Sequence, residues 1–147
     1  MTIDAPLSVT PTANTAATLT PLLLITADPS HPLAAMALRY AQAYLASSEN
    51  EPALQVFFYA DGAHTANRLR WQSADQADIT QAWQALAERY QLSLPVCVST
   101  ALSRGISDED NSYRHQLQGD NLAAGFNLVG LGELAMLLQS DCRVLQF

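Results

Sequence analysis

The residues with the clearest chemical potential lie in the stretch "SLPVCVSTALSRG", residues 93–105. A short apolar run leads into Cys97, which predicts a buried strand that ends at the cysteine. A helix capped by Ser99 or Thr100 would point its amide dipoles back at the sulfur and favour the nucleophilic thiolate, and Arg104 would add positive charge. Position alone is equally compatible with a buried structural cysteine, because cysteine is among the most buried residue types.

The other reactive side chains give weaker signals. Cys142 begins the last apolar run, so a parallel sheet places it at the edge opposite Cys97. A disulfide requires Cα atoms within about 7 Å, and this arrangement disfavours an internal redox pair. His31 and His64 follow the first two strands, which leaves a Cys–His hydrolase open as an alternative. His115 lies in an acidic stretch and carries no signal of its own.

Composition excludes several classes of protein. No Cys or His pair has the spacing of zinc ligands, and the loop "TADPSHP" lacks the glycines of a nucleotide site, so we expect neither metal nor cofactor. The net charge is −7 and all seven basic residues are arginines. The absence of lysine rules out Schiff-base chemistry, and the acidity argues against direct nucleic-acid binding.

Short apolar runs alternate with helical periods along most of the chain. The expected strands lie within 21–27, 53–62, 94–98, 124–130 and 142–147, the expected helices at 32–48, 78–91 and 131–141, and a loop or short helix begins near Ser107. This order predicts an α/β fold with a mostly parallel sheet and helices on both faces. Ligands and reactive groups gather at the carboxyl ends of such strands, where the loops "DPSHP", "DGAHTANRLRW" and "CVSTALSRG" should meet.

The organisation expected is a flexible extension over residues 1–20 and one domain over 21–147. No apolar run approaches the length of about 18 residues that a membrane helix needs, and the N-terminus does not resemble a secretory signal. Two cysteines without an export signal favour a reducing, cytoplasmic setting with free thiols.

Three blocks of sequence carry a resemblance to a known family. "FFYADGAHTAN" (57–67), "LPVCVSTALSRGI" (94–106) and "NLAAGFNLVGLGELA" (121–135), which runs into "RVLQF", occur in the order found in the TusD/DsrE family of small sulfur-relay proteins. The chain from about Leu22 to Phe147 resembles this family, and its TusD-like branch most closely.

The resemblance implies a flavodoxin-like, three-layer fold of about five strands, in which Cys97 carries sulfur as a persulfide. It also implies a hetero-hexamer with two related small subunits, a persulfide donor protein and a cysteine acceptor protein. In the TusD branch the sulfur reaches the 2-thio group of a tRNA wobble uridine, and in the DsrE branch it serves dissimilatory sulfur oxidation. A non-catalytic structural subunit is a further alternative.

The same resemblance places the loop "DGAHTAN" beside the cysteine, which makes Asp61, Gly62 and Asn67 lesser candidates. Turn formation and loop hydrogen bonding explain these three residue types better than direct chemistry does. His31, His64 and Cys142 inherit no role from the family. The expected reaction needs a solvent-reachable thiolate at Cys97 and no second thiol in this chain.

Overall fold

A computed structural model describes residues 18–47 and 53–147. Its elements are β1 (Thr20–Ile25), α1 (Pro32–Ser47), β2 (Gln55–Phe58), the 3₁₀ helix η1 (Ala60–Ala66), α2 (Ile79–Tyr90), β3 (Leu94–Cys97), α3 (Val98–Leu102), α4 (Glu109–Arg114), β4 (Phe126–Val129), α5 (Leu131–Gln139) and β5 (Cys142–Gln146). The expected alternation of strands and helices is confirmed.

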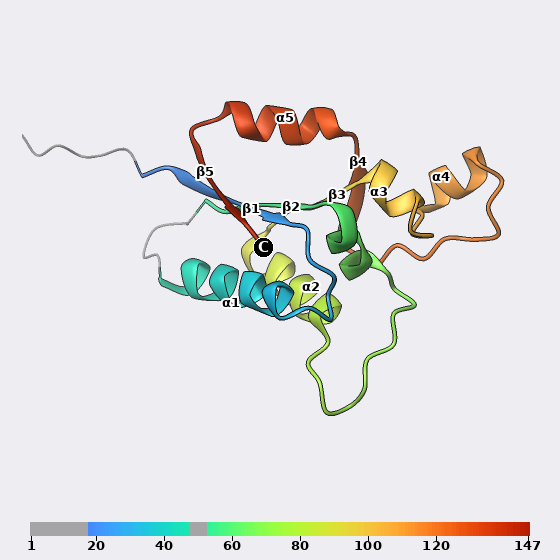
Figure 1. Ribbon diagram of the computed structural model, residues 1–147, viewed down its shortest axis with the longest axis horizontal. Coiled ribbons are helices and arrows are strands. Elements are labelled where there is room, and N and C mark those ends of the chain that lie inside the picture. The colour runs from blue at the N-terminus through green and yellow to red at the C-terminus, as the bar shows by residue number, and fades with distance from the viewer. Residues whose placement is uncertain (1–17, 48–52) are drawn as a thin grey trace, which may run out of the picture.

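The five strands form one parallel sheet in the order β4-β3-β2-β1-β5. The predicted α/β class with helices on both faces is therefore confirmed (Figure 1). The strand order differs from the 2-1-3-4-5 order of flavodoxin, because β1 lies between β2 and β5 rather than between β2 and β3.

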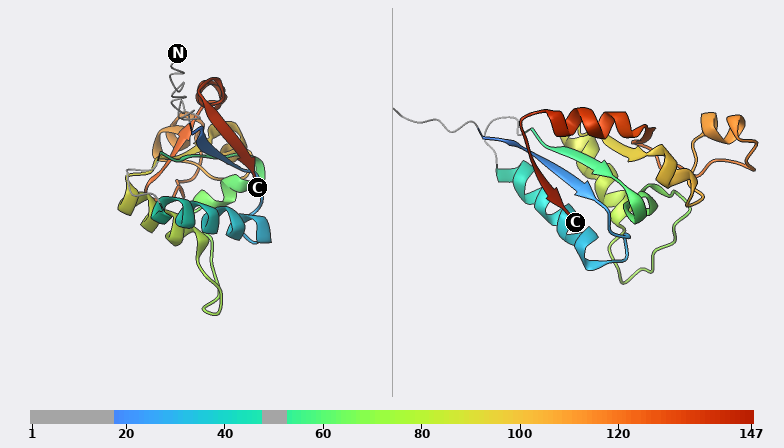
Figure 2. Two further views of the ribbon diagram at one scale, coloured as in Figure 1. Left: turned by 90° about the vertical axis from the view of Figure 1, so that its left-hand side faces the viewer. Right: turned by 45° about the horizontal axis from the view of Figure 1, so that its top comes forward.

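The strand order explains how the helices divide between the two faces. The steps from β1 to β2 and from β2 to β3 run in one direction, so right-handed connections place α1 and α2 on the same face. The connection from β4 to β5 runs back across the sheet and places α5 on the opposite face. The views in Figures 1 and 2 show α5 alone above the sheet, with α1 and α2 below it.

The two faces are covered to very different extents. The main core lies between the sheet and the helices α1 and α2, where Phe58 packs edge-on against Trp83 at a ring-centroid distance of 5.5 Å. On the other face, a small cluster of Leu22, Phe57 and Cys97 lies under α5. None of the residues of α5 is buried, so this helix is a partial cover.

Local signals set most helix ends. Pro32 opens α1, and the side chain of Asp78 caps α2 by accepting a hydrogen bond from the amide of Gln81 at 3.1 Å. The short helix expected to begin near Ser107 is α4, which is capped by the side chain of Asp108, while Ser107 itself is buried. The first strand begins at Thr20, one residue before the expected domain boundary, and residues 1–17 of the expected extension lie outside the described part of the chain.

Within residues 18–47 and 53–147, the structure contains no helix with both the length and the apolar character needed to cross a bilayer.

Candidate functional site

The carboxyl ends of β1, β2 and β3 meet at one edge of the sheet, as expected for parallel strands. The loop after β1, the helix η1 after β2 and the helix α3 after β3 all begin there. Cys97 is the last residue of β3 and pairs with Val129 of β4. The predicted position of the cysteine at this edge is confirmed.

The side chain of Cys97 is only 1% exposed. It faces α5 and belongs to the small cluster with Leu22 and Phe57, against which several half-buried residues pack: Leu24, Tyr59, Val129, Leu134, Leu137 and Cys142. The expectation of a solvent-reachable sulfur is therefore wrong for the isolated chain. The reason is that the Cys97 side chain lies on the α5 face of the sheet. There it is covered by side chains of a helix that follows more than thirty residues later in the sequence.

The cover over Cys97 is nevertheless thin. Leu134 and Leu137 of α5 pack against the cluster and remain half-exposed themselves. By contrast, the helices on the other face contain buried side chains of their own, including Leu38 of α1 and Trp83 of α2. Cys97 is thus shielded by a single incompletely packed layer.

A helix follows Cys97 directly, as predicted, but its contacts with the cysteine differ from the expectation. Cys97 itself is the N-cap of α3, so Ser99 and Thr100 lie inside the helix and do not cap it. The cysteine side chain accepts no capping hydrogen bond. Thr100 instead donates its hydroxyl to the carbonyl oxygen of Cys97 at 3.3 Å.

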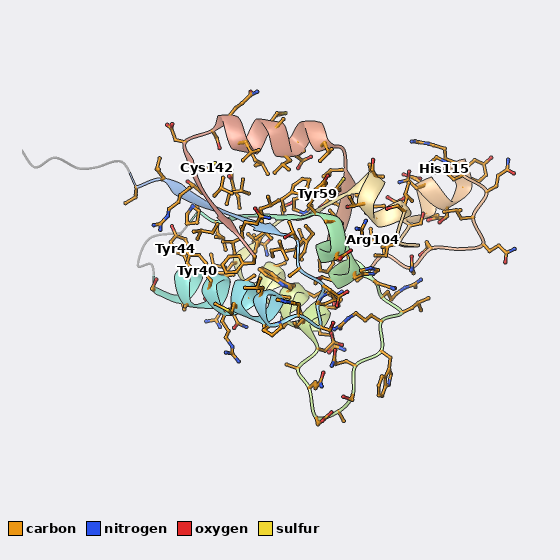
Figure 3. The ribbon with its side chains drawn as sticks, in the orientation of Figure 1. Tyr40, Tyr44, Tyr59, Arg104, His115 and Cys142 are labelled. Carbon is orange, nitrogen blue, oxygen red and sulfur yellow. The ribbon has the colours of Figure 1, made fainter. Side chains whose placement is uncertain are left out.

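Tyr59 is a neighbour of Cys97 that the sequence patterns do not single out. Phe58 pairs with Val96, and Tyr59 continues the strand in an extended conformation, with its amide donating to the carbonyl of Ile25 at 2.9 Å. Continuing this register by one residue would bring Tyr59 beside Cys97, and both residues belong to the small cluster under α5. Figure 3 shows Tyr59 on the α5 side of the sheet. The sequence contains no local signal for this proximity, because it depends on the pairing of β2 with β3.

Arg104 binds a carboxylate instead of the sulfur. Its Nε donates to Oδ1 of Asp61 at 2.9 Å, and its Nη2 lies 2.9 Å from the same oxygen. Nη1 of Arg104 also donates to the carbonyl of Thr100 at 3.2 Å. Asp61 therefore connects η1 to the residues that follow α3 and helps to hold these two segments together at the edge of the sheet.

Gly62 and Asn67 likewise have structural contacts. A Cβ on Gly62 would lie 2.1 Å from the carbonyl oxygen of Ile25, so only glycine fits there without movement of the backbone. Asn67 accepts from the amide of Leu69 at 2.9 Å and from Nδ2 of Asn121 at 3.1 Å. These contacts agree with the turn-forming and hydrogen-bonding interpretation of the loop.

A polar hollow of about 460 Å³ opens beside the same edge. Asp28, His64 and Arg70 line it together with Ser30, Asn67, Trp71, Gln72, Ser73 and Gln76. Burial raises the pKa of Asp28, but hydrogen bonds from Ser30 and the charges of His64 and Arg70 outweigh this effect, so the pKa lies below its usual 3.8.

Neither predicted loop histidine is linked to the cysteine. Nδ1 of His31 accepts from the amide of Leu33 at 3.1 Å, and His64 lines the polar hollow. Among the described residues, no hydrogen bond joins a histidine to the sulfur of Cys97. His115 is the exposed C-cap of α4. The described residues therefore contain no hydrogen-bonded Cys–His pair.

Cys142 is a free thiol and packs at the margin of the small cluster. It starts β5 opposite Thr20, while Cys97 ends β3, and β1 and β2 separate their strands. The part of the chain that the structure describes contains no group of three or more His, Cys, Asp or Glu side chains that could hold a metal ion.

The chain is similar to several known proteins. The model of the DsrE/DsrF-like family matches residues 22–147. "Sulfurtransferase TusD" of Pectobacterium carotovorum subsp. carotovorum (strain PC1) is 45% identical over 114 residues, which cover 78% of this chain and 87% of that protein. "Sulfurtransferase TusD homolog" of Aliivibrio fischeri (strain ATCC 700601 / ES114) is 42% identical over 111 residues, covering 76% and 84% of the two chains.

A solved structure shares the fold. The crystal structure of the ychN protein from E. coli superimposes with a TM-score of 0.70 at 18% sequence identity, and the match covers 88% of this chain and all of that one. At this level of identity the likeness supports the architecture alone.

Proposed function

The chain belongs to the DsrE/DsrF-like family, and on that premise we propose that it is the sulfurtransferase subunit of a sulfur relay, with Cys97 as the persulfide carrier. The observation that carries the proposal is the position of Cys97 at the reactive edge of the sheet, as the last residue of β3. The relatives named sulfurtransferase support the same activity.

Two exchange steps describe the reaction. The thiolate of Cys97 attacks the outer sulfur of a donor persulfide, a new S–S bond forms, the donor's S–S bond breaks, and the donor cysteine leaves as a thiolate. An acceptor thiolate then attacks the outer sulfur on Cys97, and Cys97 leaves as a thiolate. Sulfur atoms and electrons balance without an oxidant, a metal or a second thiol in this chain.

The burial of Cys97 has a consequence for this cycle. A persulfide oxidises readily, so a sulfur enclosed under α5 is protected between encounters. Transfer then requires the donor or the acceptor to displace the thin layer formed by Leu134 and Leu137. That displacement is feasible because both residues are only half-buried where they cover the cluster.

We propose that the partners are two related small subunits in a hetero-hexamer, together with an upstream persulfide donor and a downstream cysteine acceptor. The exposed apolar side chains next to the site support an interface on the α5 face: Leu131 and Leu138 are each 48% exposed, Met136 71% and Val144 43%. Large exposed apolar side chains that gather on one face mark interaction surfaces.

We further propose that this relay works in the cytoplasm and delivers sulfur to the 2-thio group of a tRNA wobble uridine. The net charge of −7 suits a subunit that leaves contact with the tRNA to another protein. Deleting the gene and measuring 2-thiouridine in total tRNA tests this destination. Loss of 2-thiouridine that returns with the wild-type gene and not with Cys97→Ser supports it, whereas unchanged 2-thiouridine favours the DsrE-type role in sulfur oxidation.

Loading of Cys97 is tested by incubating the purified protein with a persulfide donor and measuring its intact mass. The expected result is a gain of one sulfur atom in the wild type and in Cys142→Ser, and none in Cys97→Ser. Equal loading of the wild type and Cys97→Ser would show that Cys97 is structural and would reject the proposal.

A further inference from the structure

Apolar side chains gather around the proposed carrier cysteine under α5. Leucine, phenylalanine and valine side chains make up most of this small cluster: Leu22, Leu24, Phe57, Val129, Leu134 and Leu137. The remaining members are Tyr59 and the two cysteines. An anionic sulfur in such surroundings needs a hydrogen-bond donor, because burying an unpaired charge is costly.

Tyr59 is the member of the cluster that can supply such a donor. It directly follows β2, whose Phe58 pairs with Val96 of β3, so continuing this register places Tyr59 beside Cys97 at the usual strand spacing of about 4.8 Å. Its ring packs against the cluster, and no hydrogen bond of its hydroxyl is found among the described residues. The O–H group is therefore available to an acceptor that arrives during the reaction.

The lengths of the two side chains indicate whether the hydroxyl lies nearer to Sγ of Cys97 or to the outer sulfur of its persulfide. A tyrosine hydroxyl lies farther from the backbone than a cysteine Sγ, so from adjacent positions on one face it stands beyond the thiol. A persulfide extends the cysteine by an S–S bond of about 2.05 Å. The outer sulfur therefore lies closer to the level of the phenol group than Sγ does.

We propose that the hydroxyl of Tyr59 donates a hydrogen bond to the outer sulfur of the Cys97 persulfide and thereby stabilises the loaded, anionic state. The inference rests on the proposed function, since it requires Cys97 to carry sulfur. It assigns Tyr59 the role that a lysine, histidine or arginine plays near other reactive sulfurs. Arg104, the charged residue nearest in sequence to α3, is held by Asp61 instead.

The test is an exchange equilibrium in a Cys142→Ser background, which removes the second thiol of the cluster. The protein is equilibrated with a fixed ratio of glutathione persulfide to glutathione, and the loaded fraction is read by intact mass. Tyr59→Phe keeps the ring and removes only the hydroxyl, so we expect its loading constant at pH 8 to fall about tenfold, the effect of one hydrogen bond to a charged group. Tyr113→Phe, at a tyrosine that is 89% exposed on α4, is the matched control and should load like the parent.

The pH dependence separates hydrogen bonding from packing. At acidic pH the outer sulfur is protonated and neutral, so a hydrogen bond from Tyr59 stabilises the loaded state only slightly. The difference in loading constant between the parent and Tyr59→Phe should therefore disappear. A deficit of equal size at both pH values would mean that Tyr59 acts through packing and would overturn the proposal. Equal loading at pH 8 would overturn it as well, while loading of the parent would leave the proposed function intact.

A measurement on the unmodified tyrosine covers the case in which Tyr59→Phe fails to fold. The chain has five tyrosines, and in protein labelled with ¹³C at the Cζ atom one of their NMR signals should shift when Cys97 is loaded. The shift should be absent in Cys97→Ser treated in the same way. Loading without any tyrosine shift contradicts the proposal, and failure of the parent to load at all overturns both this inference and the proposed function.

Discussion

Gly62 fixes the path of the chain from β2 into η1, and replacing it with alanine should be strongly destabilising. The added Cβ would lie 2.1 Å from the carbonyl oxygen of Ile25 and 2.8 Å from its carbonyl carbon, whereas real Cβ contacts stay above 3.0 Å. Backbone must therefore move by roughly 1 Å in a close-packed interior. The same carbonyl oxygen accepts the amide of Tyr59 at 2.9 Å, so this hydrogen bond is disturbed too.

These two effects give the expected magnitude. Overpacking typically costs about 1–3 kcal/mol, and a disturbed backbone hydrogen bond adds about 1 kcal/mol, so we expect Gly62→Ala to lower the free energy of unfolding by about 3 kcal/mol. With a urea dependence of about 2 kcal/mol/M for a domain of this size, the midpoint should fall by about 1.5 M. Loading of Cys97 should also decrease, because Tyr59 is displaced.

Urea denaturation followed by circular dichroism measures the effect, with Gly132→Ala as the control. Gly132 lies in α5, and a Cβ added there would meet no heavy atom of a neighbouring element within 4 Å. Alanine at this position should therefore raise stability by up to about 1 kcal/mol through helix propensity. An unchanged midpoint for Gly62→Ala would refute the contact on which the reasoning depends.

Three further perturbations follow from individual contacts. In a double-mutant cycle of Asp61→Ala and Arg104→Ala, the coupling free energy should stay below about 1 kcal/mol, because the Asp61 side chain is 60% exposed. The coupling should shrink further in 1 M salt. A larger coupling that does not depend on salt would contradict this expectation. Ala60 has a positive φ of 51°, so Ala60→Gly should raise the free energy of unfolding by about 0.5–1 kcal/mol and Ala60→Val should lower it, both read from urea midpoints. Since the pKa of Asp28 is lowered in the folded state, its contribution to stability is present above pH 3.8 and is lost as the pH falls through the lowered value. The stability difference between wild type and Asp28→Asn should therefore narrow in acid titrations below about pH 4, and a difference that widens there would contradict the assignment.

Much of the architecture was predictable because its signals are local. The apolar run "PLLLI" reads as a strand buried on both faces, Pro32 marks a helix start, and Asp78 is a typical N-cap, all of which the structure contains. The position of Cys97 at the carboxyl edge also followed, because the end of a strand and the direction of a parallel sheet are enough to predict it.

The surroundings of Cys97 were not predictable in the same way. All four residues of β3 are buried, so the alternation that would assign Cys97 to one face is absent from the sequence. The assignment depends on the register of Val96 with Phe58, which is a long-range pairing. Tyr59 escapes prediction for the same reason, since its proximity to Cys97 exists only once β2 and β3 are paired.

The helix α5 explains why the exposure of the cysteine differs from the expectation. Its sequence, "LGELAMLLQ", has the apolar content of a core helix, yet none of its residues is buried in the isolated chain. Composition cannot distinguish a side chain that packs into its own domain from one that packs against another protein. Both positions favour apolar residues, because both remove the side chain from water. The burial of Cys97 and the exposure of Met136 thus have one cause. A single helix, α5, covers this face of the sheet, and it covers the face only in part. If a partner packs on that face and shifts α5, access to Cys97 changes at the same time, so the proposed assembly and the proposed sulfur transfer would depend on the same contacts, which no local pattern encodes.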